Sequence, residues 1–429
     1  MGIEFDKSNA NLVKITIMGV GGGGGNAVNR MCALRDIDLE TVKDADNADM
    51  QDNLTSLTGE EMQIEYVAVN TDSRVLEQSK ADFKVQIGDK LTEGTGAGGN
   101  PEIGEKSAEE SREKIEAMLK DTKLLILTAG MGGGTGTGAS PYIAEVAREM
   151  NILTVAIVTK PFQNEGRKRM KAAVAGIERL HGNVDSLLVI PNQKLISDDD
   201  DITLAEAYRR ADDILAQTIR SVSEIVSLIG YINLDFADLT SVLNNAGYAH
   251  LGIGIADLKE NSDGIIEAAE QAIAPNLLET SIHGAKSVLI NIIVPSMEKI
   301  SMRKLDQAIN MVTDLVDEDA DIFSGYTPMP QFGDRVRITL IATRFGDEKK
   351  KASDKKIVKT NIRANETVGE PKPVEAVDTT TVEQDTKPLE VQQNEVLIKE
   401  KETDNGDVDS DVGEFNIDDI MQMLDRRTN

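Results

Sequence analysis

A run of glycines and threonines near the middle of the chain has the composition of a phosphate-binding turn. It spans residues 128–138 and reads TAGMGGGTGTG. Glycine has no side chain, so backbone N–H groups can approach an anion closely. Thr135 and Thr137 add hydroxyls that can donate to phosphate oxygens. The other interpretation of such a run is a flexible glycine linker.

The residues on either side of this turn predict the elements that a phosphate site needs. Residues 124–127 form an apolar run typical of a buried strand, and residues 139–150 have the apolar spacing of a helix. The first turn of a helix adds a partial positive charge that favours anions. This context favours a phosphate site over a linker.

A second glycine cluster follows a strand predicted at residues 12–20 and precedes a helix expected from Ala27 to about Leu34. Gly19, Gly21 and Gly24 satisfy the GxGxxG pattern of dinucleotide-binding proteins. An NAD-type oxidoreductase is therefore the alternative function. That pattern also needs an acidic residue ~20 positions on, at the end of the second strand. The second strand is predicted only at residues 63–69, so the fingerprint lacks its context.

The composition restricts the class of protein. The chain has 429 residues, enough for two or three domains, and a formal net charge of −28. That charge argues against nucleic acid and anionic membranes as partners. Cys32 is the one cysteine, which rules out an internal disulfide, and no apolar run approaches the ~20 residues of a membrane helix. We expect a soluble cytoplasmic protein with no nucleic-acid partner and no direct membrane insertion.

A long helix and a helix start carry further polar side chains. Residues 203–229 show one continuous helical pattern, and Asp235 with Asp238 could cap a helix from Phe236 to Asn245. The same carboxylates, with Asn233, could instead hold a water or a cation against a phosphate. Composition leaves both possibilities open.

The chain beyond residue 230 changes character twice. Strands at 251–257, 287–294 and 336–343 and helices at 264–274 and 302–316 predict a smaller α/β domain. Residues 347–413 are polar and charged, which predicts a disordered acidic linker. In residues 414–429, one helical face is apolar and suits a partner's groove. That face consists of Ile417, Ile420, Met421 and Leu424.

Four motifs in order carry a family resemblance. They are GGGGGN at 21–26, GGGTGTG at 132–138, KPFQNEG at 160–166 and NLDFAD at 233–238. Together they resemble the FtsZ family, the bacterial tubulin homologues of cell division, over roughly residues 12–346. The resemblance implies an α/β fold with a tubulin-like Rossmann-type GTPase domain, a long central helix, a smaller α/β C-terminal domain and a disordered tail. The domains would be residues 1–229 and 230–346, before the linker and the terminal peptide.

The resemblance also implies a ligand and its contacts. The ligand would be GTP or GDP, with Mg²⁺ bound mainly through the phosphates and no dedicated protein ligands for a metal. Tyr208 would stack on guanine, and Asp212 would accept from its ring nitrogens, with Asp213 as a neighbouring candidate. The residues implied to contact the nucleotide are Gly22, Gly23, Gly24, Gly25, Asn26, Gly96, Ala97, Gly98, Gly99, Asn100, Gly134, Thr135, Gly136, Glu165, Arg169, Tyr208 and Asp212. From the residues alone, Glu165 and Arg169 would be an ordinary surface ion pair.

The same resemblance implies a catalytic loop that acts on the next subunit. Asp235 and Asp238 would polarise the attacking water, and Asn233 would help to position it. The protein would polymerise head to tail, hydrolyse GTP on assembly and form the ring scaffold at the mid-cell division site. A filament that hydrolyses slowly or not at all is a third interpretation. The terminal peptide is similar to one that binds membrane-tethering and regulatory proteins, although the family's usual proline is missing. Residues 36–61, expected to form a surface loop, are longer than the family's usual connection.

Overall fold

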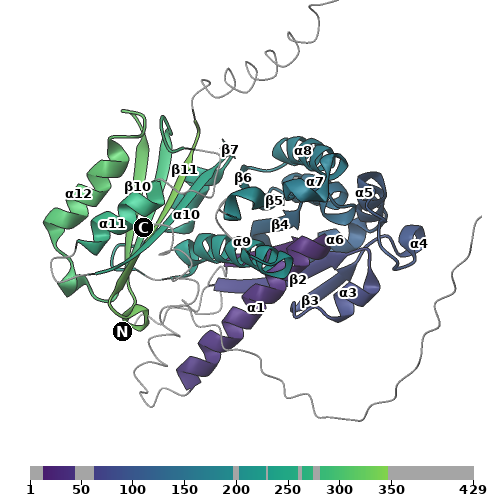
Figure 1. Ribbon diagram of the computed structural model, residues 1–429, viewed down its shortest axis with the longest axis horizontal. Helices are drawn as coiled ribbons and strands as arrows, with labels where there is room; N and C mark the ends of the chain where they lie inside the picture. The colour runs from purple at the N-terminus through teal and green to yellow at the C-terminus, as the bar shows by residue number, and fades with distance from the viewer. Residues whose placement is uncertain are drawn as a thin grey trace, which may run out of the picture. The chain divides into compact units, whose positions relative to one another are not determined.

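The computed structural model describes residues 13–43, 62–196, 202–228, 230–258, 263–273 and 281–345 (Figure 1). The predicted linker at 347–413 and the terminal peptide with Ile417, Ile420, Met421 and Leu424 lie outside the described residues. So does most of the loop predicted at 36–61. None of the helices in the described ranges is long and apolar enough to cross a bilayer.

The first sheet is parallel throughout and runs in the order β3-β2-β1-β4-β5-β6-β7. Its strands are β1 (Val13–Val20), β2 (Met62–Asn70), β3 (Phe83–Gln86), β4 (Thr122–Gly130), β5 (Leu153–Lys160), β6 (Ser186–Pro191) and β7 (Gly247–Tyr248). The strands predicted at 12–20, 63–69 and 124–127 are confirmed. The apolar runs at 152–159 and 184–190 likewise predict buried strands, and they form β5 and β6. β3 and β7 were not predicted, because they are too short to show a period.

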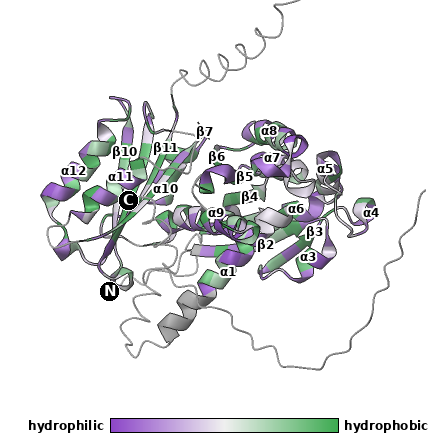
Figure 2. Ribbon diagram, viewed as in Figure 1, coloured by the Kyte–Doolittle hydropathy of each residue, from purple (hydrophilic) through white to green (hydrophobic). Residues whose placement is uncertain are grey.

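Helices cover both faces of this sheet (Figure 1). Side chains of α5 (Pro101–Glu110), α6 (Arg112–Leu119), α7 (Thr135–Glu149) and α8 (Arg167–His181) share one buried cluster with the sheet. Those of α1 (Gly21–Lys43), α9 (Leu204–Ser227) and α10 (Phe236–Leu243) share the other. The short helices α3 (Ser73–Glu77) and α4 (Asp89–Thr92) flank β3 in sequence. Hydrophobic residues concentrate on the strands, while most helices show both colours around the coil (Figure 2).

The first helix differs from its predicted bounds at both ends. α1 begins at Gly21, so the second glycine cluster is the helix's first turns rather than a loop. It continues to Lys43, so the first part of the loop expected at 36–61 is helical. No proline or glycine occurs between residues 27 and 43, so nothing in that stretch ends the helix. Ser107 as an N-cap, with Glu109 and Glu110 in the first turn, predicts a helix at 108–120. In the structure the helical segment begins earlier, at Pro101, and is divided into α5 and α6.

A second sheet, in the order β10-β9-β11-β8, packs against α9 and α10. Its strands are β8 (His250–Asp257), β9 (Ser287–Val294), β10 (Asp321–Pro328) and β11 (Arg335–Thr343). Helices α11 (Gly264–Ile273) and α12 (Met302–Thr313) cover its other face. The helices and three of these strands were predicted, whereas β10 was not, because Gly325 and Pro328 interrupt its pattern.

Helix α9 packs on both sheets. Ile219 and Val222 of α9 belong to one buried cluster with Ile17 of the first sheet and with Leu289 and Ile341 of the second. The helix predicted at 203–229 is confirmed. Because the two sheets share this cluster, the domain boundary between residues 229 and 230 stays a prediction.

A buried ion pair also joins α9 to the second sheet. Glu224 of α9 accepts a hydrogen bond from Arg337 of β11, and it accepts a second from Arg220 Nε at 2.7 Å. Burial alone would raise the pKa of the Glu224 carboxyl, but Arg337 and Arg220 hold that pKa below its usual value. The folded protein therefore prefers the charged form of Glu224.

We expect Glu224→Gln to lower the free energy of unfolding at pH 7 by about 3–5 kcal/mol, because it leaves Arg337 buried without its counter-charge. A carboxyl whose pKa is lower in the folded than in the unfolded protein stabilises the fold at pH values above its unfolded pKa, here near 4.5. This stabilisation is lost as the pH falls below that pKa. Urea unfolding at pH 7 and below pH 4 measures both effects, and the difference between variant and wild type should shrink in acid. Asp334→Asn, which breaks the exposed Lys299–Asp334 pair, is the control and should barely move the urea midpoint. Equal shifts for the two variants would contradict the assignment.

Candidate functional site

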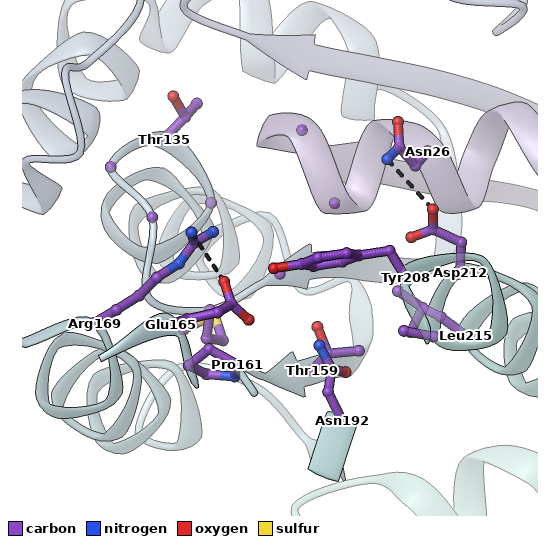
Figure 3. Close-up of a pocket in the computed structure, with 18 residues that line it drawn as sticks. Asn26, Thr135, Thr159, Pro161, Glu165, Arg169, Asn192, Tyr208, Asp212 and Leu215 are labelled. Atoms are coloured by element: carbon purple, nitrogen blue, oxygen red, sulfur yellow. Dashed lines mark hydrogen bonds and ion pairs between the residues drawn. The ribbon is translucent and has the colours of Figure 1, made fainter. Parts of the chain in front are cut away.

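A cavity of about 360 Å³ lies where β1, β4, β5 and β6 end and α1 and α7 begin (Figure 3). Its volume is within the range of roughly 300–1,000 Å³ found for small-molecule sites. The carboxyl ends of parallel strands are where ligands bind in such sheets. The lining residues are Gly22, Gly23, Asn26, Gly130, Met131, Gly133, Gly134, Thr135, Gly136, Thr159, Pro161, Glu165, Arg169, Asn192, Tyr208, Ala211, Asp212 and Leu215.

Most of the residues predicted to contact a nucleotide meet in this wall. Those brought together are Gly22, Gly23, Asn26, Gly134, Thr135, Gly136, Glu165, Arg169, Tyr208 and Asp212. Gly24 and Gly25 do not line the cavity. A Cβ on Gly24 would collide with the carbonyl oxygen of Thr128, so Gly24 lets α1 pack closely on the sheet.

A third glycine cluster, at residues 94–100, packs against the lining residue Gly134. Gly96, Ala97, Gly98, Gly99 and Asn100 are not among the lining residues. An ideal Cβ on Gly134 would lie only 2.9 Å from Ala97 Cβ and 3.0 Å from Asn100 N. Asn100 Oδ1 accepts from Glu102 N at 3.0 Å and caps α5, a role that the sequence suggested for Ser107 in a later helix. Ser107 lies inside α5 and donates to Ile103 O.

The turn at residues 128–138, called the signature turn below, is shaped by its backbone and by two hydroxyls that form hydrogen bonds. Gly132 has φ +104°, and a Cβ there would lie 2.7 Å from Arg169 Cγ, so the turn requires glycine. Thr137 Oγ1 accepts from Gly132 N at 2.7 Å and is buried outside the lining. Of the two threonines predicted to reach a phosphate, Thr135 lines the cavity and shares a hydrogen bond with Thr71. Thr137 instead holds the shape of the turn.

The N-termini of two helices give the side of the cavity beside the glycine turns its positive character. α7 begins at Thr135, and its N-cap, Gly134, has no side-chain cap. The N–H groups in the first turn of a helix have no partner within the helix and point toward an anion. Gly22 and Gly23 are in the first turn of α1. Two helix starts therefore line the same cavity.

The opposite side of the cavity carries an aromatic ring and a carboxylate, as Figure 3 shows. Tyr208 packs edge-on against Phe162, with ring centroids 5.2 Å apart. Asp212 Oδ2 accepts from Asn26 Nδ2 at 3.3 Å. Burial raises the pKa of Asp212 to about 6. Asp213 does not line the cavity and pairs with Arg30 at 2.6 Å. Between these two adjacent acids, the geometry favours Asp212 as the ligand contact.

Glu165 and Arg169 form the ion pair expected from their spacing, at 2.9 Å (Figure 3). Glu165 is not an ordinary surface partner, since its side chain is only 7% exposed. Its Oε1 also accepts from Phe162 N at 2.7 Å. The pair is therefore a fixed part of the wall, and it holds the Arg169 guanidinium beside the signature turn.

Asn192 is a lining residue that sequence reasoning missed. It follows β6 directly, is only 6% exposed, and its Oδ1 has no hydrogen-bond partner within the described ranges. A buried acceptor without a partner costs free energy, which a ligand donor would recover. The signal in the sequence was a polar residue just after a buried parallel strand.

Asn233, Asp235 and Asp238 lie apart from the cavity, and none of them lines it. Asp235 Oδ1 accepts from Asp238 N at 2.8 Å, and Asp238 Oδ2 accepts from Asp235 N at 3.1 Å. The predicted cap of α10 is thus confirmed as a capping box. It uses one oxygen of each carboxylate. The other oxygens have no hydrogen-bond partner among the residues described.

The cavity suits a purine nucleotide with several phosphates. Backbone N–H groups and Arg169 gather at one side, and Tyr208 with Asp212 at the other. Within the described ranges, no three His, Cys, Asp or Glu residues gather into a metal site.

Comparison with known proteins agrees with this chemistry. Residues 14–199 match the model of the Tubulin/FtsZ family, GTPase domain, and residues 247–346 match that of the FtsZ family, C-terminal domain. An FtsZ dimer from M. jannaschii, solved empty, is 37% identical with a TM-score of 0.66, over 79% of this chain and 89% of that one. CetZ2 from Haloferax volcanii, solved as a GTPγS-bound protofilament, has 18% identity and a TM-score of 0.63, over 81% and 100% of the two chains. These matches confirm the predicted fold and do not favour the oxidoreductase. The chain belongs to the Tubulin/FtsZ family of GTPases.

Proposed function

We propose that this protein hydrolyses GTP to GDP and phosphate in an active site shared between adjacent subunits of a head-to-tail polymer. Family membership supports GTP binding and GTPase activity in general. The observation that carries the shared site is the separation of the two halves. The cavity lies at the start of α9, and Asn233, Asp235 and Asp238 follow its end. A helix of 24 residues spans about 36 Å, too far for one chain to close its own site.

In this proposal, the phosphates lie against the glycine turns. Backbone N–H groups of Gly22, Gly23 and Gly134 to Gly136 donate to phosphate oxygens, and Arg169 adds a positive charge. Glu165 keeps Arg169 in place. Mg²⁺, bound mainly through the phosphates, would neutralise charge on them. No lysine of a Walker motif is available, so backbone donors carry the binding.

The guanine lies between α1 and α9. Tyr208 stacks on the ring, and Phe162 holds the tyrosine ring in place. Asp212 accepts from the two N–H donors on guanine's Watson–Crick edge. Adenine presents an acceptor at one of these positions, so a carboxylate there disfavours it. Asn26 holds Asp212 in position through its hydrogen bond.

The neighbouring subunit contributes the catalytic residues. Asp235 and Asp238 each keep one carboxylate oxygen outside the capping box, and these oxygens would polarise the attacking water. Asn233 would help to position that water. Phosphoryl transfer needs positioning and charge more than covalent chemistry, so association can complete the site. The box holds both carboxylates in fixed orientations before the subunits meet.

We further propose that the polymer is the cytoplasmic ring scaffold at the mid-cell division site. The match to the FtsZ C-terminal domain supports this role, as do relatives solved as a dimer and a protofilament. The terminal peptide, through Ile417, Ile420, Met421 and Leu424, would bind membrane-tethering and regulatory division proteins.

Turnover per subunit should rise with protein concentration, because a lone chain lacks the catalytic loop in its cavity. Phosphate release measured over a hundredfold range of concentration tests this, with light scattering recorded in parallel. The rate should rise with scattering and level off once assembly is complete. A rate per subunit that is the same at every concentration would rule out the shared site.

Asp238→Asn should leave GTP affinity within about twofold and lower hydrolysis by roughly 100-fold or more. Asparagine keeps an oxygen that can complete the capping box, so the helix start survives while the charge is lost. Binding is measured with a fluorescent GTP analogue below the assembly concentration, and turnover above it. Loss of nucleotide binding would mean that Asp238 serves the fold instead.

GDP affinity should fall as the pH drops through about 6, because guanine donors need the ionised Asp212 and protonation removes it. The decrease should approach tenfold per pH unit below that value. Asp212→Asn should bind at least about tenfold more weakly at pH 7.5 and should lose this dependence on pH. Comparison with wild type cancels titration of the phosphates. Asp213→Asn, whose side chain pairs with Arg30, is the control and should retain both affinity and pH profile.

A further inference from the structure

The loop that carries the catalytic residues makes few contacts on its outer side. Between α9 and α10, Tyr231 is 76% exposed and Ile232 is 50% exposed. Asn233 is also exposed, and its Oδ1 accepts only a long bond, 3.4 Å, from Gly230 N. Contacts on the inner side of the loop must therefore keep it in one conformation.

Strand β10 provides that support. Tyr231 N donates to Tyr326 O at 2.7 Å, and Tyr326 N donates to Ile232 O at 3.0 Å. These bonds form an antiparallel bridge between Ile232 and Tyr326. β10 is at the edge of the second sheet, so the loop occupies an edge that would otherwise expose unpaired backbone groups.

A glycine in β10 makes room for Leu234, a buried side chain of the loop. Leu234 is 4% exposed and belongs to the core cluster that α9 shares with both sheets. An ideal Cβ on Gly325 would lie 2.7 Å from both Cγ and Cδ1 of Leu234. Gly325 does not have a positive φ, so its role here is space rather than backbone freedom. Leu234 immediately precedes Asp235, the first residue of the capping box.

The second sheet also holds the far end of α10. Thr343 Oγ1 of β11 donates to Val242 O at 2.8 Å, and Arg344 donates to Ser241 O at 2.7 Å. Asp235 and Asp238 thus lie on a segment that is tied to the second sheet before and after them. A displacement of this sheet relative to α9 would carry both carboxylates with it.

We propose that Gly325 and Tyr326 are positioning residues for GTP hydrolysis. Gly325 receives Leu234, and the backbone of Tyr326 fixes residues 231 and 232, so β10 sets where Asp235 and Asp238 meet the next subunit's nucleotide. This inference rests on the shared site proposed above. It gives β10, the edge strand of the second sheet, a role in the active site, although β10 supplies neither the cavity wall nor the catalytic carboxylates.

Complementation between variants tests the assignment. Gly325→Ala should bind GTP within about twofold of wild type, since it is outside the cavity wall, and should lose at least tenfold in turnover. Mixed with Asp212→Ala, which has a weakened cavity and an intact loop, it should recover activity. In a random 1:1 polymer, about one interface in four joins a working cavity to a working loop, so recovery should approach a quarter of the wild-type rate. Mixed with Asp238→Ala, it should recover nothing, because both partners then lack a working loop.

Three controls make each outcome decisive. Gly182→Ala, where a Cβ has ordinary space, should keep full turnover. The mixture of Asp212→Ala with Asp238→Ala must itself complement; if it does not, the shared site is wrong and this inference fails with it. Leu234→Ala removes the buried side chain from the other partner and should behave like Gly325→Ala, so it decides the matter if the glycine variant does not fold. β10 does not position the loop if Asp212→Ala and Asp238→Ala complement each other but Gly325→Ala and Leu234→Ala regain activity when mixed with Asp238→Ala. The same conclusion follows if Gly325→Ala and Leu234→Ala regain activity with neither Asp212→Ala nor Asp238→Ala.

Discussion

The burial of α9 between two sheets is the constraint on which the rest of this structure depends. Its C-terminal half is apolar on the sides that face both sheets, and Glu224 adds a charged link to Arg337. A helix packed this way can neither bend nor slide without opening a core. It therefore fixes how far the nucleotide cavity at its start lies from the loop at its end. The shared active site that we propose follows from that fixed length, because one chain cannot bring both halves together.

The cavity is built mainly from backbone, and this explains its glycines. Gly132 and Gly134 have neighbours so close that a Cβ would meet Arg169 or Ala97. Three glycine clusters therefore serve different purposes. One turn exposes N–H groups to the cavity, Gly24 allows α1 to approach the sheet, and the third cluster supports Gly134 from behind. A polyanion can be bound this way without a lysine, since helix starts supply the positive character.

Neighbouring carboxylates in this protein have different roles because their surroundings differ. Asp212 is half-buried at the cavity with only an amide as hydrogen-bond partner, and partial burial raises its pKa to about 6. Asp213 of α9 pairs with Arg30 of α1, the helix beside it on the same face of the sheet. Asp235 and Asp238 each spend one oxygen on the capping box. The box is compatible with the catalytic role that we propose, because each carboxylate keeps a second oxygen outside it.

The sequence alone determined what depends on neighbouring residues. Apolar runs located β1, β2, β4, β5 and β6, the 3.6-residue period located α9, and the local cap at Asp235 located α10. The ordered glycine and acidic motifs indicated the family and most of the cavity wall. These signals are local, since periodicity and turn chemistry act over a few residues.

Tertiary structure alone decided what depends on contacts between distant residues. β3, β7 and β10 are too short or too interrupted to recognise, and they form because a neighbouring strand offers them an edge. Asn192 enters the wall because β6 ends there, and Arg337 becomes Glu224's partner across 113 positions of sequence. The support of the loop by Gly325 belongs to this class too. The space beside Gly325 that Leu234 fills forms only when β10 and the loop pack together, so no local pattern in the sequence encodes it.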